Sequence, residues 1–379
     1  MAGKRSIFEE VEAGAEAKPA PTGGMIETGR GGARGAVRVW LMVLFGLVAL
    51  MIVIGGLTRL TDSGLSITEW APISGAVPPM SAEAWTAEFE AYKTIPEYEL
   101  QNKGMTLAEF KSIYWWEWGH RQLGRVIGLV WAVGFFGFLA TRKMPTGWTV
   151  RLLMLGVLGG LQGAIGWWMV SSGLGEGRVD VASYRLAIHL GLAFAILGLI
   201  TWFVLSLGRG DSALIQARRN REARLSSVST GLMHFAFLQI LLGALVAGID
   251  AGRAFPTWPL MGDGFFPPDA FQLSPVWRNF FEDAGLVQFV HRISGYLLFV
   301  MGIVTWNRAR KSPNAQTRFA FNAVLALMTL QVVLGIVTVL YSAQVHVAIT
   351  HQIGAIVLWV LILRGRFLAQ YPIPQSLRG

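Results

Sequence analysis

Four histidines are spaced so that they could bind metal in pairs. His120, His189, His291 and His351 lie at or near the same end of four long apolar segments. In each half of the sequence, two histidines from two helices would then lie at similar depth, which is the geometry that holds one planar iron porphyrin between two imidazoles. Ionisable groups inside membrane spans are costly, so function is the first hypothesis for them.

Haem iron fits these pairs better than zinc or copper. No carboxylate or thiol joins each pair at a ligand spacing that recurs in both halves. The chain has no cysteine, which excludes disulfides, thiolate metal sites and cysteine nucleophiles. The residues therefore predict two bis-histidine haem sites.

Two other histidines do not fit the pairing. His234 lies near the opposite end of its segment and has no equivalent in the first half, so we interpret it as structural. His346 precedes His351 by five residues, which is about 140° beyond a full helical turn, so the two cannot easily face one iron. Tyr184 stands at the equivalent place in the first half. The sequence leaves the role of His346 open.

Charged residues accompany the predicted ligands. Arg121 and Arg292 follow their histidines in both halves, where they could bind haem propionates or extend toward lipid headgroups. Glu117 lies one turn before His120, whereas the second half has Gln288 at that place. A carboxylate beside a reacting porphyrin could accept a proton or stabilise positive charge, which makes Glu117 the candidate catalytic residue. The alternative is an interfacial acid without a catalytic role.

The elements that position these residues are apolar helices. Of 379 residues, 53% are hydrophobic and 15% are charged, and the mean hydropathy of +0.48 fits a polytopic membrane protein. The runs lack strict period-2 alternation, which argues against a β-barrel. We therefore predict an all-α protein with eight transmembrane helices. The runs cover about 39–57, 122–141, 152–170, 186–207, 228–249, 287–307, 319–341 and 347–363.

The second half of the chain resembles the first. "HRQLG" at 120–124 matches "HRISG" at 291–295, "LQGAIG" at 161–166 matches "LQVVLG" at 330–335, and "AIHLGLAFAIL" at 187–197 resembles "ITHQIGAIVLW" at 349–359. The order is shared and the offsets are similar, so we predict two pseudo-symmetric four-helix bundles in the same orientation. The predicted parts are a disordered tail 1–38, a first half 39–207, a linker 208–227, a second half 228–363 and a tail 364–379.

The basic residues predict the orientation in the membrane. Of the 32 Lys and Arg residues, 21 fall in the tails and loops on one side, which the positive-inside rule places in the cytoplasm together with both termini. Topology accounts for the net charge of +9, so nucleic acid is not an expected partner. No secretory signal precedes the first span, and four glutamates within the first 16 residues do not fit a mitochondrial transit peptide. We expect a multi-pass protein of the bacterial cell inner membrane.

These residues together resemble the haem A synthase family over about residues 39–365. The most specific parts are E-x-x-H-R at 117–121, "GGLTRLTDSGLSITEW" at 55–70, and the histidines in spans two, four, six and eight. The resemblance implies that the first half holds the substrate haem O, with His120 and His189 facing its iron. It implies that His291 and His351 ligate a haem B cofactor, and that Glu117 is the acid beside the substrate.

The resemblance also implies the reaction, in which a haem O methyl group is oxidised to a formyl group through hydroxylated intermediates. Some family members carry cysteine pairs in outer loops; this chain has none and resembles the cysteine-free proteobacterial and mitochondrial branch. Expected partners are the lipid bilayer, haem O synthase and a second copy of the chain, while the oxygen source and the electron partner are not legible. Two alternatives stay open: a di-haem, quinone-linked electron-transfer protein and a transporter.

Overall fold

The computed structural model describes residues 31–373, apart from residue 176. Every regular element in these residues is a helix, and eight of the helices are long and apolar enough to cross a membrane. The eight are α1 (Gly31–Leu60), α4 (Leu107–Ala140), α5 (Thr149–Val170), α6 (Ser183–Leu207), α8 (Ala223–Gly248), α10 (Ala284–Ala309), α11 (Ala315–Leu340) and α12 (Val345–Gln370). The predicted all-α membrane fold is confirmed, because each long helix covers one of the predicted apolar runs to within one residue.

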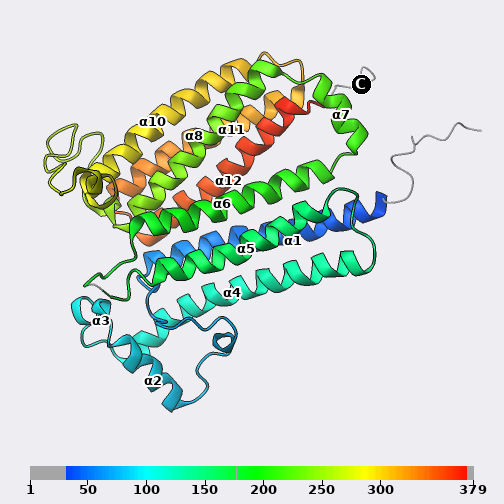
Figure 1. Ribbon diagram of the computed structural model, residues 1–379. Helices are drawn as coiled ribbons and strands as arrows, with labels where there is room; N and C mark the ends of the chain where they lie inside the picture. The colour runs from blue at the N-terminus through cyan, green and yellow to red at the C-terminus, as the bar shows by residue number, and fades with distance from the viewer. Residues whose placement is uncertain (1–30, 176, 374–379) are drawn as a thin grey trace, which may run out of the picture.

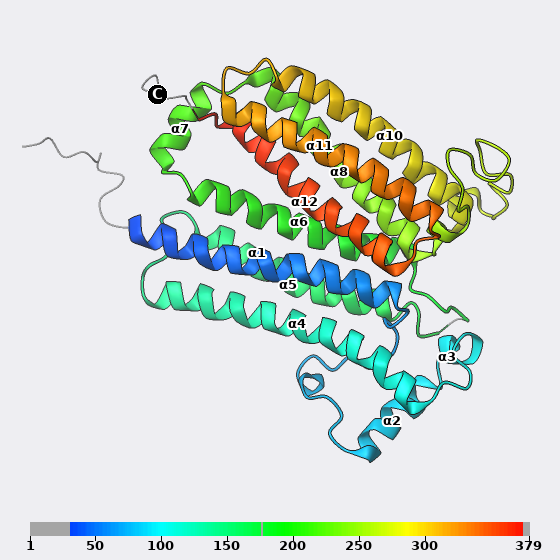
Figure 2. The ribbon, with the colours of Figure 1, turned by 180° about the vertical axis from the view of Figure 1, so that it is seen from behind.

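The long helices run side by side along the molecule (Figure 1, Figure 2). On one side lie α1, α4 and α5, and on the other lie α8, α10 and α11. Between them, α6 contacts α1, α5, α8 and α12, while α12 contacts α1, α6, α8 and α11. The most apolar stretch of α6 is 56% buried, against 6% for α4 at the edge. The centre of the molecule is therefore built from the last long helix of each half of the chain.

The connections differ between the two ends of the molecule. Helix α7 (Asp211–Arg219) lies at the end where α1 begins and α12 ends; we call this the α7 end (Figure 1). At the opposite end, which we call the loop end, lie α2 (Ala82–Tyr92), α3 (Pro96–Leu100) and the segment 249–283. That segment contains η2 (Ala251–Arg253), η3 (Val276–Arg278) and α9 (Asn279–Glu282), and η1 (Ser74–Ala76) precedes α2.

Several helix ends extend beyond the predicted runs. The predicted tail 1–38 is wrong for residues 31–38, which are helical in α1; residues 1–30 lie outside the described residues. The cause is tertiary contact, since Arg34 pairs with Asp211 over 3.0 Å and Arg38 donates to the carbonyl oxygen of Val204. Residues 364–370 of the predicted C-terminal tail are likewise helical, and the carbonyl oxygen of Ala369 accepts from the backbone of Glu222.

Helix α4 crosses the membrane and also continues beyond it. Its 34 residues extend for about 51 Å at 1.5 Å per residue, against roughly 30 Å of hydrocarbon. The helix begins with a capping box, in which Thr106 accepts from the backbone of Glu109 and the Glu109 carboxylate accepts from the backbone of Thr106. The first turns of α4 pack under α2 through an aromatic cluster that includes Phe89, Phe110 and Tyr114. Helix α2 at the loop end is thus attached directly to the helix that carries His120.

Candidate functional site

The four predicted haem ligands lie toward the loop end of four long helices. His120 is in α4, His189 in α6, His291 in α10 and His351 in α12, and all four side chains are half-buried. His120 lies within electrostatic range of His189, and His291 within that range of His351. The structure therefore brings together the two histidines of each predicted pair.

Each of these imidazoles packs against a glycine on a neighbouring helix. If the glycine carried a Cβ atom, that atom would lie 2.9 to 3.3 Å from the Cε1 atom of the ring. Carbon atoms prefer a separation of about 3.5–4.0 Å, so a larger residue would displace the ring. The pairs, with the Cβ to Cε1 distance, are Gly55 and His120 (2.9 Å), Gly166 and His189 (2.9 Å), Gly243 and His291 (3.1 Å), and Gly335 and His351 (3.3 Å).

Three glutamines hold three of the histidines. Each donates from Nε2 to the backbone carbonyl oxygen of its histidine over 3.0 Å; the pairs are Gln162 with His189, Gln239 with His291 and Gln331 with His351. The amide nitrogens of Gln162 and Gln239 also lie 3.1 Å from Nδ1 and 3.4 Å from Nε2 of the adjacent ring. Because the amide is nearly equidistant from both ring nitrogens, it is not on the axis of either lone pair. Each of these two amides therefore contacts both the ring and the backbone of its histidine.

The donor set fits an iron porphyrin in each half. Nδ1 of His120 and Nδ1 of His351 are buried with no hydrogen-bond partner in the described residues, although buried polar atoms normally have one. Each pair offers two imidazoles from different helices, and the glycines give the rings room against the backbone. Such an arrangement can ligate haem iron from both sides.

Glu117 is buried and its carboxylate is fully engaged. Its side chain is 4% exposed, and Oε1 accepts from Nε and Nη2 of Arg121 over 3.0 and 2.6 Å. Oε2 accepts from Ser66 Oγ and from the backbone N–H of Ile67, both over 2.8 Å. These contacts join α4 to the segment that follows α1. Four donors occupy about all the lone-pair positions that a carboxylate offers.

The two arginines after the histidines bind the segments that follow α1 and α8. Arg121 donates to the carbonyl oxygens of Ile67 and Glu69 over 2.7 and 2.8 Å. Arg292 donates to the carbonyl oxygen of Phe255 over 2.8 Å, and its buried Nε has no partner in the described residues. The arginines therefore share an anchoring contact, and Arg292 keeps one donor free.

Gln288 replaces the acid in the second half. It is 2% exposed and donates weakly to the carbonyl oxygens of Gly252 and Phe255, over 3.4 and 3.3 Å. Its Oε1 has no partner in the described part of the chain. Glu117 and Gln288 thus lie at corresponding positions and contact corresponding loop segments, but only Glu117 is charged.

The remaining histidines stand apart from the pairs. His234 is exposed in α8, and its Nδ1 lies 2.9 Å from the carbonyl oxygen of Thr230 one turn earlier. His346 is exposed in the first turn of α12, where its carbonyl oxygen accepts from Thr350. These contacts agree with a structural role for His234.

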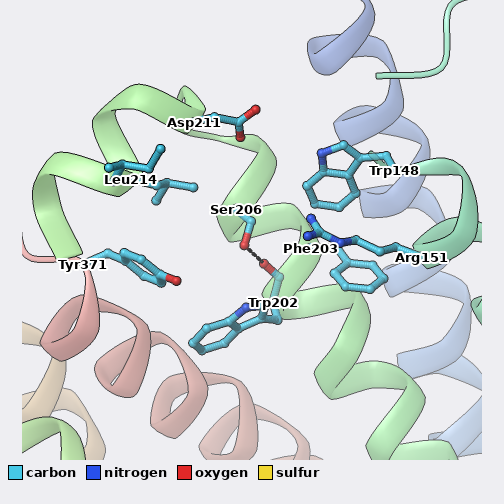
Figure 3. A pocket seen from close by; sticks show the side chains of 9 residues that line it. Trp148, Arg151, Trp202, Phe203, Ser206, Asp211, Leu214 and Tyr371 are labelled. Atoms are coloured by element: carbon cyan, nitrogen blue, oxygen red, sulfur yellow. Dashed lines mark hydrogen bonds between the residues drawn. The ribbon is translucent and has the colours of Figure 1, made fainter. Parts of the chain in front are cut away.

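A hollow of about 460 Å³ lies at the α7 end, away from the histidines (Figure 3). Trp148, Trp202 and Tyr371 point into it, and Ser206 donates to the carbonyl oxygen of Trp202 at its edge. Trp202 is 13 residues after His189 in α6, which is roughly 20 Å along the axis. The hollow is therefore separate from the four histidines.

Comparison with known proteins agrees with this site. A family model described as cytochrome oxidase assembly protein matches residues 38–363. The chain is 65% identical over 381 residues to heme A synthase of Ruegeria pomeroyi, covering 100% of both chains. It is 65% identical over 380 residues to heme A synthase of Dinoroseobacter shibae, covering 100% of this chain and 99% of that one, and 59% identical over 376 residues to that of Paracoccus denitrificans, covering 99% of each. Since these bacterial proteins align with it from end to end, the chain belongs to the haem A synthase family.

Proposed function

We propose that this chain is a membrane oxidoreductase of haem A biosynthesis that oxidises a methyl group of haem O to a formyl group through hydroxylated intermediates. The observation that carries the proposal is the recurrence of two neighbouring histidine pairs at one end of the helices. The full-length similarity to heme A synthases supports the same reaction. The bacterial relatives and the eight apolar helices support a place in the inner membrane.

The two pairs have different partners in this proposal. His120 and His189 face the iron of the substrate haem O, and His291 and His351 ligate the iron of a resident haem B. Haem B, when bound, supplies a one-electron relay. The presence of Glu117 in one half and of uncharged Gln288 in the other supports unlike sites.

Arg121 and Arg292 are proposed to bind haem propionates in addition to the backbone. The free Nε of Arg292 supports this role, because a buried guanidinium donor is costly without an acceptor. Arg121 gives all its observed hydrogen bonds to Glu117 and to loop carbonyls, so its first role is to hold the loop over the first pair.

Glu117 acts as a fixed negative charge and not as a base. Its lone pairs are taken by donors, so there is none left for a substrate proton. The carboxylate is held in place one helical turn before His120. From there it can stabilise positive charge that develops as the methyl group is oxidised. This is the catalytic role that we assign to it.

The predicted domain organisation stays part of the proposal. Residues 39–207 and 228–363 would be two pseudo-symmetric bundles joined by the cytoplasmic linker 208–227, with both termini in the cytoplasm and the loop end outside. The repeated pairing of a histidine with a glycine on the preceding long helix supports the symmetry. Haem O synthase, which would supply the apolar substrate, and a second copy of the chain are proposed partners.

Extraction and identification of the haems in purified histidine variants tests the proposal. His291→Ala and His351→Ala should remove haem B, whereas His120→Ala and His189→Ala should keep most haem B and make no haem A. His234→Ala is the control, because this histidine is exposed and outside both pairs, and it should keep both haem B and the product.

Two results would contradict the proposal. If all four variants lose the same haem, the division between substrate and cofactor is wrong. If the wild-type protein holds only haem B, at both sites, and forms neither haem O nor haem A complexes, the chain is a di-haem electron-transfer protein.

A further inference from the structure

One sequence motif lies beside three of the four histidines. Three long helices carry L-Q-x-x-x-G: "LQGAIG" at 161–166 in α5, "LQILLG" at 238–243 in α8 and "LQVVLG" at 330–335 in α11. In each, the glycine accommodates the imidazole ring and the glutamine binds the backbone of the same histidine. In α1 the motif is "LMIVIG" at 50–55, with Met51 where the others have glutamine.

Met51 in the first half occupies a position equivalent to that of Gln239 in the second half. Gly124 and Gly295 each lie four residues after the histidine of α4 or α10. A Cβ atom on Gly124 would lie 3.2 Å from Met51 Cε, and one on Gly295 would lie 3.2 Å from Gln239 Nε2. The two side chains therefore reach equivalent points on the helices that carry His120 and His291.

A second substitution accompanies the first. Gln239 Oε1 accepts from Ser294 Oγ, which fixes the amide so that its nitrogen faces His291. The residue equivalent to Ser294, three positions after His120, is Leu123. A polar pair in the second half is thus replaced by an apolar pair in the first. His120 Nδ1 is buried without a hydrogen-bond partner in the described residues.

We propose that the glutamine of this motif is a positioning residue that holds its histidine before haem binds, and that Met51, which stands in its place in α1, makes His120 the displaceable ligand of the substrate site. The proposal rests on the assignment of haem O to the first half and haem B to the second. An imidazole already held by an amide loses less rotational freedom when it binds iron. A methionine side chain is flexible and gives no such directional contact. A site that must admit haem O and release haem A benefits from one loosely held ligand.

Haem transfer to an acceptor measures this difference without relying on activity. Purified full-length protein is reloaded with haem B as the probe, and its transfer to excess apomyoglobin is followed by absorbance. Outer contacts to metal-binding histidines typically change metal affinity about 10–100-fold. We expect a fast and a slow phase, with Met51→Gln slowing the fast phase about tenfold and Gln239→Met accelerating the slow phase by a similar factor. Met51→Leu is the matched control and should leave both phases unchanged.

The orientation of the imidazole planes gives an independent signal. The low-spin electron paramagnetic resonance of the oxidised protein should change in Met51→Gln and not in Met51→Leu. Should Gln239→Met fail to fold, Ser294→Ala removes the hydroxyl that fixes Gln239 and should accelerate the slow phase in the same direction.

The two hypotheses fail in different ways. Equal transfer rates and spectra for Met51→Gln and Met51→Leu would overturn the positioning role. If instead His291→Ala leaves the slow phase intact, the assignment of the retained haem to the second half is wrong, whatever the effect of Met51→Gln.

Discussion

At the scale of single residues, the asymmetry between the two halves is concentrated in a few side chains. Glu117 and Gln288 occupy corresponding positions one turn before a proposed ligand histidine, and both are buried against a loop. Only Glu117 carries charge, and Arg121 balances it over 2.6 Å. Breaking a buried pair by removing one partner leaves an uncompensated charge. The first histidine pair therefore has a buried ion pair one turn before His120, and the second histidine pair has no charge at the corresponding position.

Replacing Glu117 should separate chemistry from binding. Glu117→Gln keeps the size of the side chain but removes the charge, and loss of one preorganised electrostatic contact typically lowers the rate by about 10²–10³. We expect this variant to retain haem B, to accumulate haem O or a hydroxylated intermediate, and to make little haem A. Glu117→Asp should recover part of the activity. The measurement is the profile of extracted haems.

Ser66→Ala is the control for loop anchoring. It removes one hydrogen bond to Glu117 and leaves the carboxylate in place. If Ser66→Ala loses as much haem A as Glu117→Gln, the role of Glu117 is to hold the loop. Near-normal haem A in Glu117→Gln would make it an interfacial acid without a part in the reaction.

At the scale of helices, contact between neighbours determines where each ligand lies, and a glycine is needed at the contact. In α5, Gly166 faces the ring of His189, whereas a Cβ atom on Gly163 would meet nothing within 4 Å. Gly166→Ala should push the imidazole away from its position, weaken binding of the substrate haem about tenfold or more, and leave haem B in place. Gly163→Ala, three residues earlier, is the matched control. Equal haem binding and equal product in the two variants would show that the ring has room to move.

The segment 82–106 at the loop end carries a buried acid, Glu97, whose protonation affects the stability of that segment. Burial raises the pKa of Glu97 to about 8, and its Oε2 has no partner in the described residues. Tyr92 donates to Oε1 of the same carboxyl over 3.3 Å. Because this pKa is higher than in the unfolded chain, the folded loop binds more protons than the unfolded one between the ordinary pKa of 4.5 and about 8. Its stability is therefore highest at low pH and declines as the pH rises through that range.

Limited proteolysis of the 82–106 segment tests this dependence. Cleavage should become faster as the pH rises from about 6 to about 8, after correction for the pH dependence of the protease on a reference peptide. Glu97→Gln should flatten the profile. The exposed Glu99→Gln should not change it, because Glu99 pairs only with Lys103 at the surface. A wild-type profile as flat as that of Glu97→Gln would contradict the assignment.

The sequence predicts the long helices better than their ends. Hydropathy identifies all eight spans because each must bury about 20 apolar residues in lipid. It misses the first turns of α1, which depend on the contacts of Arg34 and Arg38 with residues about 170 positions away. It also does not show that the residues from 107 to 121 form one continuous helix with the predicted span 122–141.

The same limit applies to the site. The histidine pairs follow from periodicity and repetition. The bond from Ser66 to Glu117 joins residues 51 positions apart and cannot be read from spacing. The role of the glutamines could have been predicted, because "LQGAIG" and "LQVVLG" already match each other in the sequence. The third copy, "LQILLG", carries the same signal.

At the scale of the whole molecule, contacts between distant segments join the halves of the chain. At the loop end, Arg59 at the end of α1 pairs with Asp62, Asp180 and Asp250 over 2.9, 3.3 and 3.0 Å. Asp180 precedes α6 and Asp250 follows α8, so one guanidinium links segments from both halves. Deeper in the bundle, Gln352 in α12 donates to the carbonyl oxygen of Ile52 in α1 over 2.6 Å. Such contacts hold the two halves together, so that both histidine pairs lie toward the loop end of the molecule.

That common level makes the orientation of the chain a prediction about where the haem sites face. The predicted cytoplasmic tails and loops carry 21 of the 32 basic residues. The described parts of these segments lie at the α7 end (Figure 1), so the positive-inside rule predicts that this end is in the cytoplasm. A reporter active only in the periplasm should therefore be silent when fused after Asn220, which follows α7, and active when fused after Lys103, which follows α3. A cytoplasm-specific reporter at the same two positions is the matched control and should give the reverse pattern. Since His189, His291 and His351 lie within the first two or three turns of helices that begin at the loop end, this orientation opens both sites toward the periplasmic side. Activity of the periplasmic reporter after Asn220 would invert the molecule and turn the haem ligands toward the cytoplasm.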